Sequence, residues 1–294
     1  MTHPFDENRS GDSAHPQQMW QAPSEPFAPP PAQPYQQPAS WLTFGPPPYA
    51  NRSFRPVRGL GLAASILICA VVLSEALFAV SDWYTYRVVS DYVDGTVKDP
   101  SRLNRADLLG GVVASGYLLA LAAAAVVFIV WLWRVRGNAE VFCDARHRRS
   151  RGWVIGGWFC PVVNLWFPKQ IVDDVIAASD PRTPPRVPDL RGIRPHGLVL
   201  AWWITWLVSA VVGNVGGTDA ASDVPDLGDQ AVGANWSSVS AVMTAISAVL
   251  AIRVIRFVNR LQMSRPWTPW WATDPSAAPA AQYPYGQQPP WPAQ

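Results

Sequence analysis

Glu75 is the residue of this sequence whose position most directly suggests chemistry. It interrupts the apolar stretch 59–80, and an ionisable side chain at membrane depth is a functional hypothesis by default. At a rise of about 1.5 Å per helical residue, three polar residues of two other apolar stretches fall at a similar depth: Ser115, Tyr117 and Thr244. We expect them to hydrogen-bond Glu75, in a proton or cation relay or in a structural contact between helices. The structural alternative, or a carboxyl near enough to the outer surface to stay hydrated, is favoured because no basic partner or second buried carboxylate accompanies Glu75.

Six arginines that follow the apolar stretch 108–133 form a second candidate site. They are Arg134, Arg136, Arg146, Arg148, Arg149 and Arg151. Near an anionic membrane surface each basic residue contributes about 1 kcal/mol of attraction, so we expect the cluster to bind anionic lipid head groups on the inner leaflet. The same charges also set the orientation of the neighbouring helices. Nucleic-acid binding is not expected beside membrane spans.

Cys143, His147 and Cys160 suggest a metal site only weakly. Their spacing is irregular, and Asp144 is the one nearby residue that would complete a zinc site, so we expect no metal and no other cofactor. An odd number of cysteines without framework spacing predicts no disulfide. The sequence contains no nucleophile-elbow, metalloprotease, phosphate-loop or dinucleotide motif, and we therefore do not expect an enzyme.

The elements that must position these residues are long apolar stretches. A helix needs about 20 apolar residues to cross a hydrocarbon core of about 30 Å. Four stretches qualify, and they predict an all-α membrane protein with four transmembrane helices at about 59–80, 108–133, 197–215 and 236–255. This membrane domain is expected within 51–265. The Pro/Gln-rich segment 1–50 and the Pro/Trp-rich segment 266–294 bury too little apolar surface to fold, so we expect both to be disordered tails.

The distribution of basic residues predicts the orientation. Eleven of the 23 basic residues lie in the connection 134–194, whereas residues 216–235 contain no Lys or Arg. Positive charge is retained on the inner side, so the long connection and both termini are expected in the cytoplasm, and the protein in the plasma membrane with several passes.

The apolar segment 153–168 is predicted to enter the inner leaflet without crossing the membrane. It is short, basic residues flank it on both sides, and Pro161 removes a backbone donor from its middle. Asn164 is expected to satisfy backbone groups there. The next residues, 169–179, predict an interfacial amphipathic helix. Its apolar face is Ile171, Val172, Val175 and Ile176, and its polar face is Lys169, Gln170, Asp173 and Asp174.

Residues 59–262 resemble a known family. "WLWRVRGNAE" at 131–140, "RRSRGWVIGGWFCPVVNLWFPKQIVDDVIAAS" at 148–179 and the later "LAWWITWLVS" resemble an uncharacterised membrane protein family, domain of unknown function 4328, typical of high-GC Gram-positive bacteria. The matching positions are Trp133, Arg134, Asn138, Ala139, Trp153, Gly157, Trp158, Phe159, Pro161, Asn164, Leu165, Trp166 and Pro168. The family often has an aliphatic residue in place of Cys160 and a proline in place of Arg151, which argues against thiol chemistry. The resemblance implies a multi-pass bacterial membrane protein and no particular activity.

Two functional hypotheses follow. The first is a non-enzymatic scaffold, sensor or assembly factor that contacts inner-leaflet lipids and binds protein partners through its Pro-rich tails. The alternative is a small transporter or channel subunit that uses Glu75 and the segment 153–168. An intramembrane enzyme acting on lipid is a third class, for which the sequence offers no catalytic pair. The sequence predicts no oligomeric state.

Overall fold

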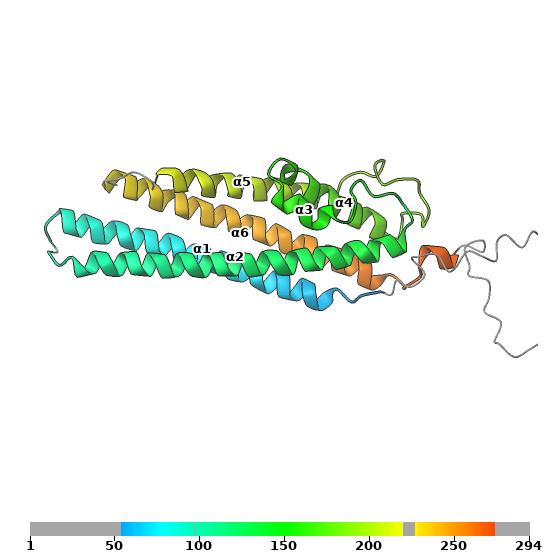
Figure 1. Ribbon diagram of the computed structural model, residues 1–294, viewed down its shortest axis with the longest axis horizontal. Helices are drawn as coiled ribbons and strands as arrows, with labels where there is room; N and C mark the ends of the chain where they lie inside the picture. Colours follow the sequence, from blue (N-terminus) through cyan, green and yellow to red (C-terminus); the bar gives the residue numbers. More distant parts are fainter. Residues whose placement is uncertain (1–53, 97, 220–226, 274–294) are drawn as a thin grey trace, which may run out of the picture. The chain divides into compact units, whose positions relative to one another are not determined.

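The computed structural model describes residues 54–96, 98–219 and 227–273, and these ranges form helices without any strand (Figure 1). The predicted all-α class is confirmed. The elements are α1 (Arg58–Val93), α2 (Ser101–Phe142), α3 (Trp153–Phe159), the 3-10 turn η2 (Val163–Leu165), α4 (Phe167–Ser179), α5 (Gly197–Asp219), α6 (Leu227–Ser264) and the 3-10 turn η3 (Trp270–Thr273). The disorder expected for 1–50 lies outside the described residues, and so does all of the expected tail 266–294 after residue 273.

Three of these helices are long and apolar enough to cross a membrane, namely α1, α2 and α6. Each contains one predicted span and continues beyond it. The 42 residues of α2, for example, give a length of about 63 Å, twice the thickness of a hydrocarbon core. The fourth predicted span falls on α5, whose described apolar part, Gly197–Gly213, is shorter than the other three. The membrane character is therefore carried by three helices of the described chain.

The helix α1 continues to Val93 and α2 begins at Ser101, so both helices extend into 81–107, the connection between the first two predicted spans. The helix α1 ends with the N–H of Asp94 bonded to the carbonyl of Ser90, and Gly95 follows at φ 71°. This left-handed conformation is the usual way to terminate a helix, and glycine adopts it without strain. Asp99 then accepts hydrogen bonds from the N–H and hydroxyl of Ser101 at the start of α2.

The helix α1 packs against both α2 and α6, and α5 packs against α6 (Figure 1). The helices α1 and α6 approach each other closely at Gly61, where a Cβ atom would overlap the side-chain nitrogen of Asn259 and lie 3.0 Å from Ile255. Asn259 is itself held by the indole N–H of Trp131, which donates to its Oδ1 at 3.0 Å. Gly61 therefore allows three helices to meet at the end of the bundle formed by the start of α1 and the ends of α2 and α6, which is called the inner end after the side of the membrane expected for it.

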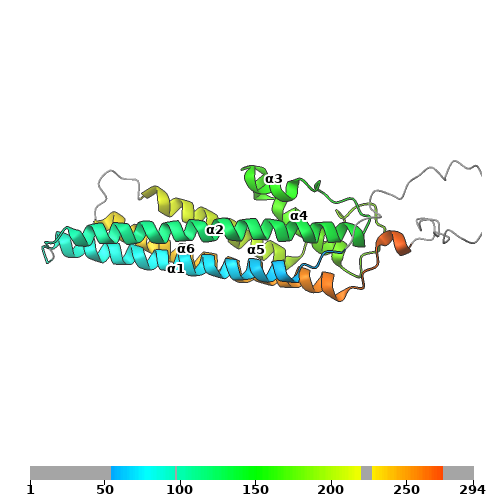
Figure 2. The ribbon, with the colours of Figure 1, turned by 60° about the horizontal axis from the view of Figure 1, so that its bottom comes forward.

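The helix α4 packs against α2, α5 and α6, and α3 lies beside it at the periphery of the long helices (Figure 2). The prediction that α4 is an interfacial amphipathic helix is wrong in one respect, because its polar face is not exposed to water. Nearly all of α4 is buried, including both aspartates of the expected polar face, Asp173 and Asp174. A single sequence shows which face is polar, but it does not show whether water or other parts of the same chain cover that face.

Candidate functional site

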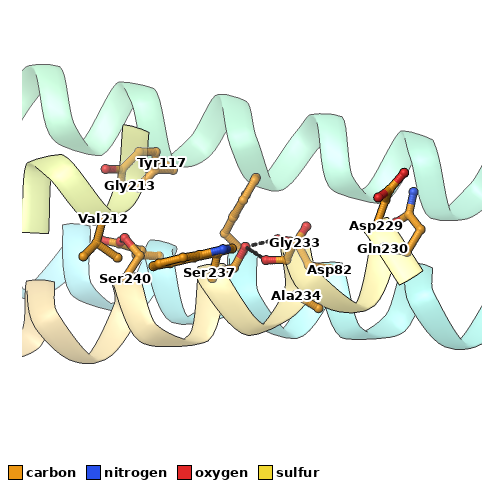
Figure 3. A pocket seen from close by; sticks show the side chains of 13 residues that line it. Asp82, Tyr117, Val212, Gly213, Asp229, Gln230, Gly233, Ala234, Ser237 and Ser240 are labelled. Carbon is orange, nitrogen blue, oxygen red and sulfur yellow. Dashed lines mark hydrogen bonds between the residues drawn. The ribbon is translucent and has the colours of Figure 1, made fainter. Parts of the chain in front are cut away.

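A pocket of ≈ 390 Å³ lies between α1, α2, α5 and α6 (Figure 3). Its polar lining consists of Glu75, Asp82, Tyr117, Asp229, Gln230, Ser237 and Ser240. Glu75 is the deepest acid, with 8% of its surface exposed, whereas Asp229 in the first turn of α6 is exposed. The pocket therefore runs from the exposed start of α6 to a buried carboxyl group inside the bundle.

Glu75 makes a direct contact with α6 rather than with the residues predicted from the sequence. The hydroxyl of Ser240 donates to Oε1 of Glu75 at 2.6 Å. Tyr117 lines the same pocket, but Ser115 is exposed and its hydroxyl donates to the carbonyl of Gly111 in its own helix. Thr244 is partly buried one turn further along α6 than Ser240 and is not among the lining residues.

Asp82 is a second partly buried carboxylate in this pocket, and the sequence analysis missed it. It lies seven residues after Glu75, two helical turns further along the same face of α1, and it accepts a hydrogen bond from the hydroxyl of Ser237. The predicted span ended at residue 80, which placed Asp82 in a loop. The sequence offered one signal for this site. Glu75 and Asp82 are seven residues apart, which places them on one face of a helix, and Ser237 and Ser240 are three residues apart, which does the same for α6.

Two arginines of the predicted lipid-binding cluster hold the inner end of the bundle together. Arg136 has 4% of its surface exposed, bonds the carbonyl of Arg149 at 3.2 Å and lies 3.3 Å from the carboxylate of Glu140. The backbone N–H of Arg148 donates to Asp174 at 2.7 Å, and its guanidinium lies 3.3 Å from the same carboxylate. These two side chains are therefore engaged within the protein.

Arg149 and Arg151 pack against aromatic rings. The guanidinium of Arg149 lies 3.7 Å from the centre of the Phe167 ring and donates to Gln170. The guanidinium of Arg151 lies 4.3 Å from the centre of the Trp133 ring. Such contacts satisfy the apolar stem and the charge of arginine together.

The other two members of the arginine cluster are Arg134 and Arg146. Arg146 is exposed, and its backbone forms an isolated bridge with Asp189. The side chain of Arg134 is partly exposed. Unlike the other four arginines, neither of these two has its guanidinium in an ion pair or ring contact described above.

Asn138, singled out as a motif residue, occupies the centre of a buried polar network. Its side chain accepts from the N–H of Arg55 at 3.2 Å and donates to the carbonyl of Arg55 at 2.9 Å and to Gln262 at 3.1 Å. Gln262 in turn donates to the carbonyl of Val135 and to the hydroxyl of Ser179. Because each group has a partner, the network joins α2, α4, α6 and the segment before α1 without leaving these amides unsatisfied.

The segment 153–168 folds as two short helical pieces, broken at Cys160 and Pro161. Gly157 is buried, and a Cβ atom there would lie 3.4 Å from Phe167. Pro168 stands in the first turn of α4, where its missing N–H costs nothing. The backbone N–H of Asn164 bonds the carbonyl of Cys160, and its Oδ1 is buried without a partner among the described residues.

Trp158 anchors this segment to the long helices through aromatic contacts. Its ring meets those of Phe128, Trp203 and Trp206 at centroid distances of 5.7, 6.1 and 5.7 Å. The indole of Trp203 donates to the carbonyl of Leu165 at 2.8 Å, which fixes η2 against α5.

Several apolar side chains of the same segment point outward. The most exposed is Phe159, at 74%. The others are Trp153, Ile155, Val162, Leu165 and Trp166. Six exposed apolar side chains on so short a segment are typical of a surface that contacts lipid or protein.

Burial controls the charge state of two groups at the inner end of the bundle. It raises the pKa of Asp174, although the N–H and the guanidinium of Arg148 oppose the shift. It lowers the pKa of His147 to about 3, and nearby Arg136 adds to this effect. Both ring nitrogens of His147 are buried without a hydrogen-bond partner in the described part of the chain, so the ring is neutral at pH 7.

The cysteines are separate from one another in the structure. Cys143 is buried and donates to the carbonyl of Pro184, and burial raises the pKa of its thiol. Cys69 and Cys160 are exposed thiols. Within the described ranges, no three His, Cys, Asp or Glu side chains converge closely enough to hold a metal ion.

Comparisons with known proteins complete this description. A family model described as a domain of unknown function (DUF4328) matches residues 94–260, which is more than half of the chain. The match includes α2 to α5 and most of α6, and it leaves out α1 with Glu75 and Asp82, the last residues of α6 with Gln262, and the residues after α6. No curated protein and no solved structure matches the chain.

Proposed function

This chain belongs to the DUF4328 family, and we propose that it is a non-enzymatic integral protein of the bacterial plasma membrane that acts as a scaffold for partners at the cytoplasmic surface. One observation carries the proposal: the segments that lead to the two tails are packed on each other. The ring centroids of Phe54 and Trp267 are 4.8 Å apart, and those of Trp267 and Phe142, at the end of α2, are 5.3 Å apart.

The residues after α6 strengthen this contact. Trp270 and Trp271 are buried against Val141. Both indoles lie within the segment 266–294 that was expected to be a tail, and we propose that the free tail begins after them. Proline-rich composition concealed them, because their apolar partner lies on α2, far away in the sequence. A scaffold that presents two tails benefits from a fixed common exit point, since tethering raises the local concentration of one tail beside the other.

The proposed topology has four crossings, with α5 as the third, and both termini in the cytoplasm. The charge distribution supports this arrangement, because an uncharged run such as Leu198–Val215 between a basic and an acidic segment is typical of a span. The apolar part of α5, Gly197–Gly213, is shorter than a full span, so the helical residues that follow Gly213, up to Asp219, would complete the crossing.

The segment 153–168 is proposed to insert into the inner leaflet. Trp158 contacts Phe128, which lies five residues, or about 7 Å, inside the predicted inner end of α2. The outward-facing side chains Phe159 and Val162 would meet lipid tails at that depth. The arginine-on-aromatic contacts of Arg149 and Arg151 lie at the boundary of this surface, where head groups begin.

Cysteine accessibility tests the topology. In a background with Cys69, Cys143 and Cys160 replaced by alanine, single cysteines are placed by Thr96→Cys, Ser150→Cys, Arg182→Cys and Pro225→Cys. A membrane-impermeant maleimide on intact cells should label positions 96 and 225, and should label 150 and 182 only after lysis. Labels at 150 and 182 in opposite compartments would show that the segment 153–168 crosses the membrane and would overturn the arrangement.

Co-purification tests the scaffold. Crosslinked partners are compared between the full chain and variants lacking residues 1–53, residues 274–294 or both, so that the packed segments stay in place. The double variant Phe54→Ala/Trp267→Ala keeps both tails but removes the contact between their exits. We expect each deletion to lose partners and the double variant to recover fewer complexes containing both sets. An unchanged partner set after removal of both tails would refute the scaffold.

A transporter or channel subunit is the second candidate, and the pocket at Glu75 is the observation that favours it. Transport also requires a path to the inner side. The inner half of the bundle is filled by Trp131, Leu132 and Ile255, which are fully buried, and by the close approach at Gly61. Proton or cation flux into proteoliposomes, compared between the native chain and Glu75→Gln, distinguishes the two functions. Flux at the background level in both proteins would exclude transport of protons or cations through Glu75.

A further inference from the structure

We propose that the pocket between α1, α2, α5 and α6 binds a small organic ammonium ion, with Oε2 of Glu75 accepting a hydrogen bond from its N–H group. This ligand site goes beyond the scaffold function, because it lies at the other end of the bundle from the tails and depends on different residues.

The carboxyl group of Glu75 lacks one of the partners that a buried acid needs. Its Oε1 accepts from Ser240, whereas Oε2 is buried without a partner among the described residues, in a side chain that lines the pocket. A buried carboxylate without compensation is costly, by several kcal/mol in a low-dielectric setting. A donor that carries positive charge would satisfy both the free oxygen and the negative charge.

The surroundings select a cation. Asp82 and Asp229 line the same pocket, and none of the described lining residues is basic. Residues 216–235, which lead into and begin α6, contain no Lys or Arg. Carboxylates inside a cleft with apolar walls concentrate the negative potential and raise the local concentration of cations.

The lining favours an organic cation over a metal ion. A hard metal ion requires several oxygen ligands at 2.3–2.6 Å or closer, and no three acidic side chains of the described chain converge in that way. The pocket instead presents the aromatic side chains of Phe78, Tyr117 and Trp236 together with Val212. Aromatic faces attract ammonium groups, and a volume of ≈ 390 Å³ falls within the range of small-molecule sites.

The geometry also defines how a ligand enters. Asp229 and Gln230 lie at one end of the pocket, and Tyr117, Val212 and Ser240 lie at the other (Figure 3). Along α6 the distance from Asp229 to Ser240 is about 16 Å at 1.5 Å per residue. An ammonium ion would meet the exposed Asp229 first and then move toward Glu75.

Two probes with the same carbon skeleton test the proposal. The purified full chain in neutral detergent at pH 7 is titrated with 3,3-dimethylbutylammonium and with uncharged 3,3-dimethylbutan-1-ol, and the heat of partition into empty micelles is subtracted. We expect saturable binding of the ammonium ion and none of the alcohol. Glu75→Gln should weaken ammonium binding at least tenfold. Asp91→Asn removes an exposed charge from α1 outside the pocket, and it should leave the affinity for the ammonium ion within twofold of the native value.

A second variant decides the matter if Glu75→Gln does not fold. A Cβ atom at Gly233 would meet nothing within 4 Å, so Gly233→Leu fills the pocket without changing its charge and also favours the helix. Loss of ammonium binding in Gly233→Leu supports the site. Ammonium affinity that is unchanged in Gly233→Leu, or saturable binding of the alcohol with equal affinity, overturns it.

Discussion

Asn138 of α2 and Gln262 of α6 share a hydrogen bond of 3.1 Å between Nδ2 and Oε1 inside the inner end of the bundle. Gln262 has 1% of its surface exposed, so water does not replace this bond. Through the further bonds of the two amides, the pair fixes the chain before α1 and the end of α4. The motif residue Asn138 is therefore explained by assembly of the fold.

Asn138→Ala should destabilise the protein markedly. The change removes the donor to the buried side-chain oxygen of Gln262, and a buried unsatisfied group costs about 1–3 kcal/mol. The N–H and carbonyl of Arg55 also lose their partner, but this residue is exposed and water can hydrate them. We therefore expect a loss of about 1–3 kcal/mol. Reversible unfolding in mixed micelles measures it. Asn235→Ala is the control, because this exposed side chain bonds only a carbonyl of its own helix. Equal loss in the two variants would contradict the role of the network.

Gly61→Ala should weaken the contact between α1 and α6, whereas Gly59→Ala should not. The added methyl group at 61 overlaps the Asn259 amide, which is held by Trp131, and overpacking of this kind costs about 1–3 kcal/mol. At Gly59 nothing lies within 4 Å, so alanine should be neutral or stabilising through its helix propensity. Melting temperatures in the same detergent give the comparison. A Gly61→Ala protein as stable as Gly59→Ala would show that Asn259 moves aside freely.

The arginine cluster should separate into structural and lipid-binding members. Arg148→Gln leaves Asp174 buried without its ion pair and should destabilise the protein in neutral detergent by about 2–4 kcal/mol. Arg134→Gln should leave that stability unchanged but reduce the stabilisation produced by added phosphatidylglycerol. Thermal unfolding with and without this lipid measures both effects. If only Arg148→Gln lost the stabilisation by lipid, our assignment of lipid binding to Arg134 would be wrong.

Stability should fall as the pH is lowered below about 6.5, in part because of His147. The unfolded chain binds a proton to this residue below its ordinary pKa of 6.5, whereas the folded chain does so only near 3. The resulting loss between pH 7 and pH 5 is at most about 2 kcal/mol, and it stops growing near pH 3. His147→Leu should match the native protein at pH 7 and exceed it at pH 5. Parallel pH profiles of the two proteins would show that His147 does not contribute.

The sequence predicted the helical class and the long apolar helices because hydrophobic length is a local property of the chain. It also indicated that Glu75 and Tyr117 lie at similar depth, since helical rise converts residue number into distance. It did not identify Ser240 as the partner of Glu75 or Asp82 as the second acid of the pocket. Those choices depend on the rotation of α6 about its axis and on the continuation of α1 past its apolar stretch.

The sequence by itself determined composition-driven features: which segments are apolar enough for a membrane, where positive charge accumulates, and which family the motif resembles. The tertiary structure alone decided which polar groups are buried together. Arg136, Asp173 and Asp174 are charged residues of the kind expected at a surface, yet all three are buried. The two aspartates are buried because α4 packs against α2, α5 and α6. Burial and pairing depend on contacts between distant segments, and hydropathy along a single chain carries no information about those contacts.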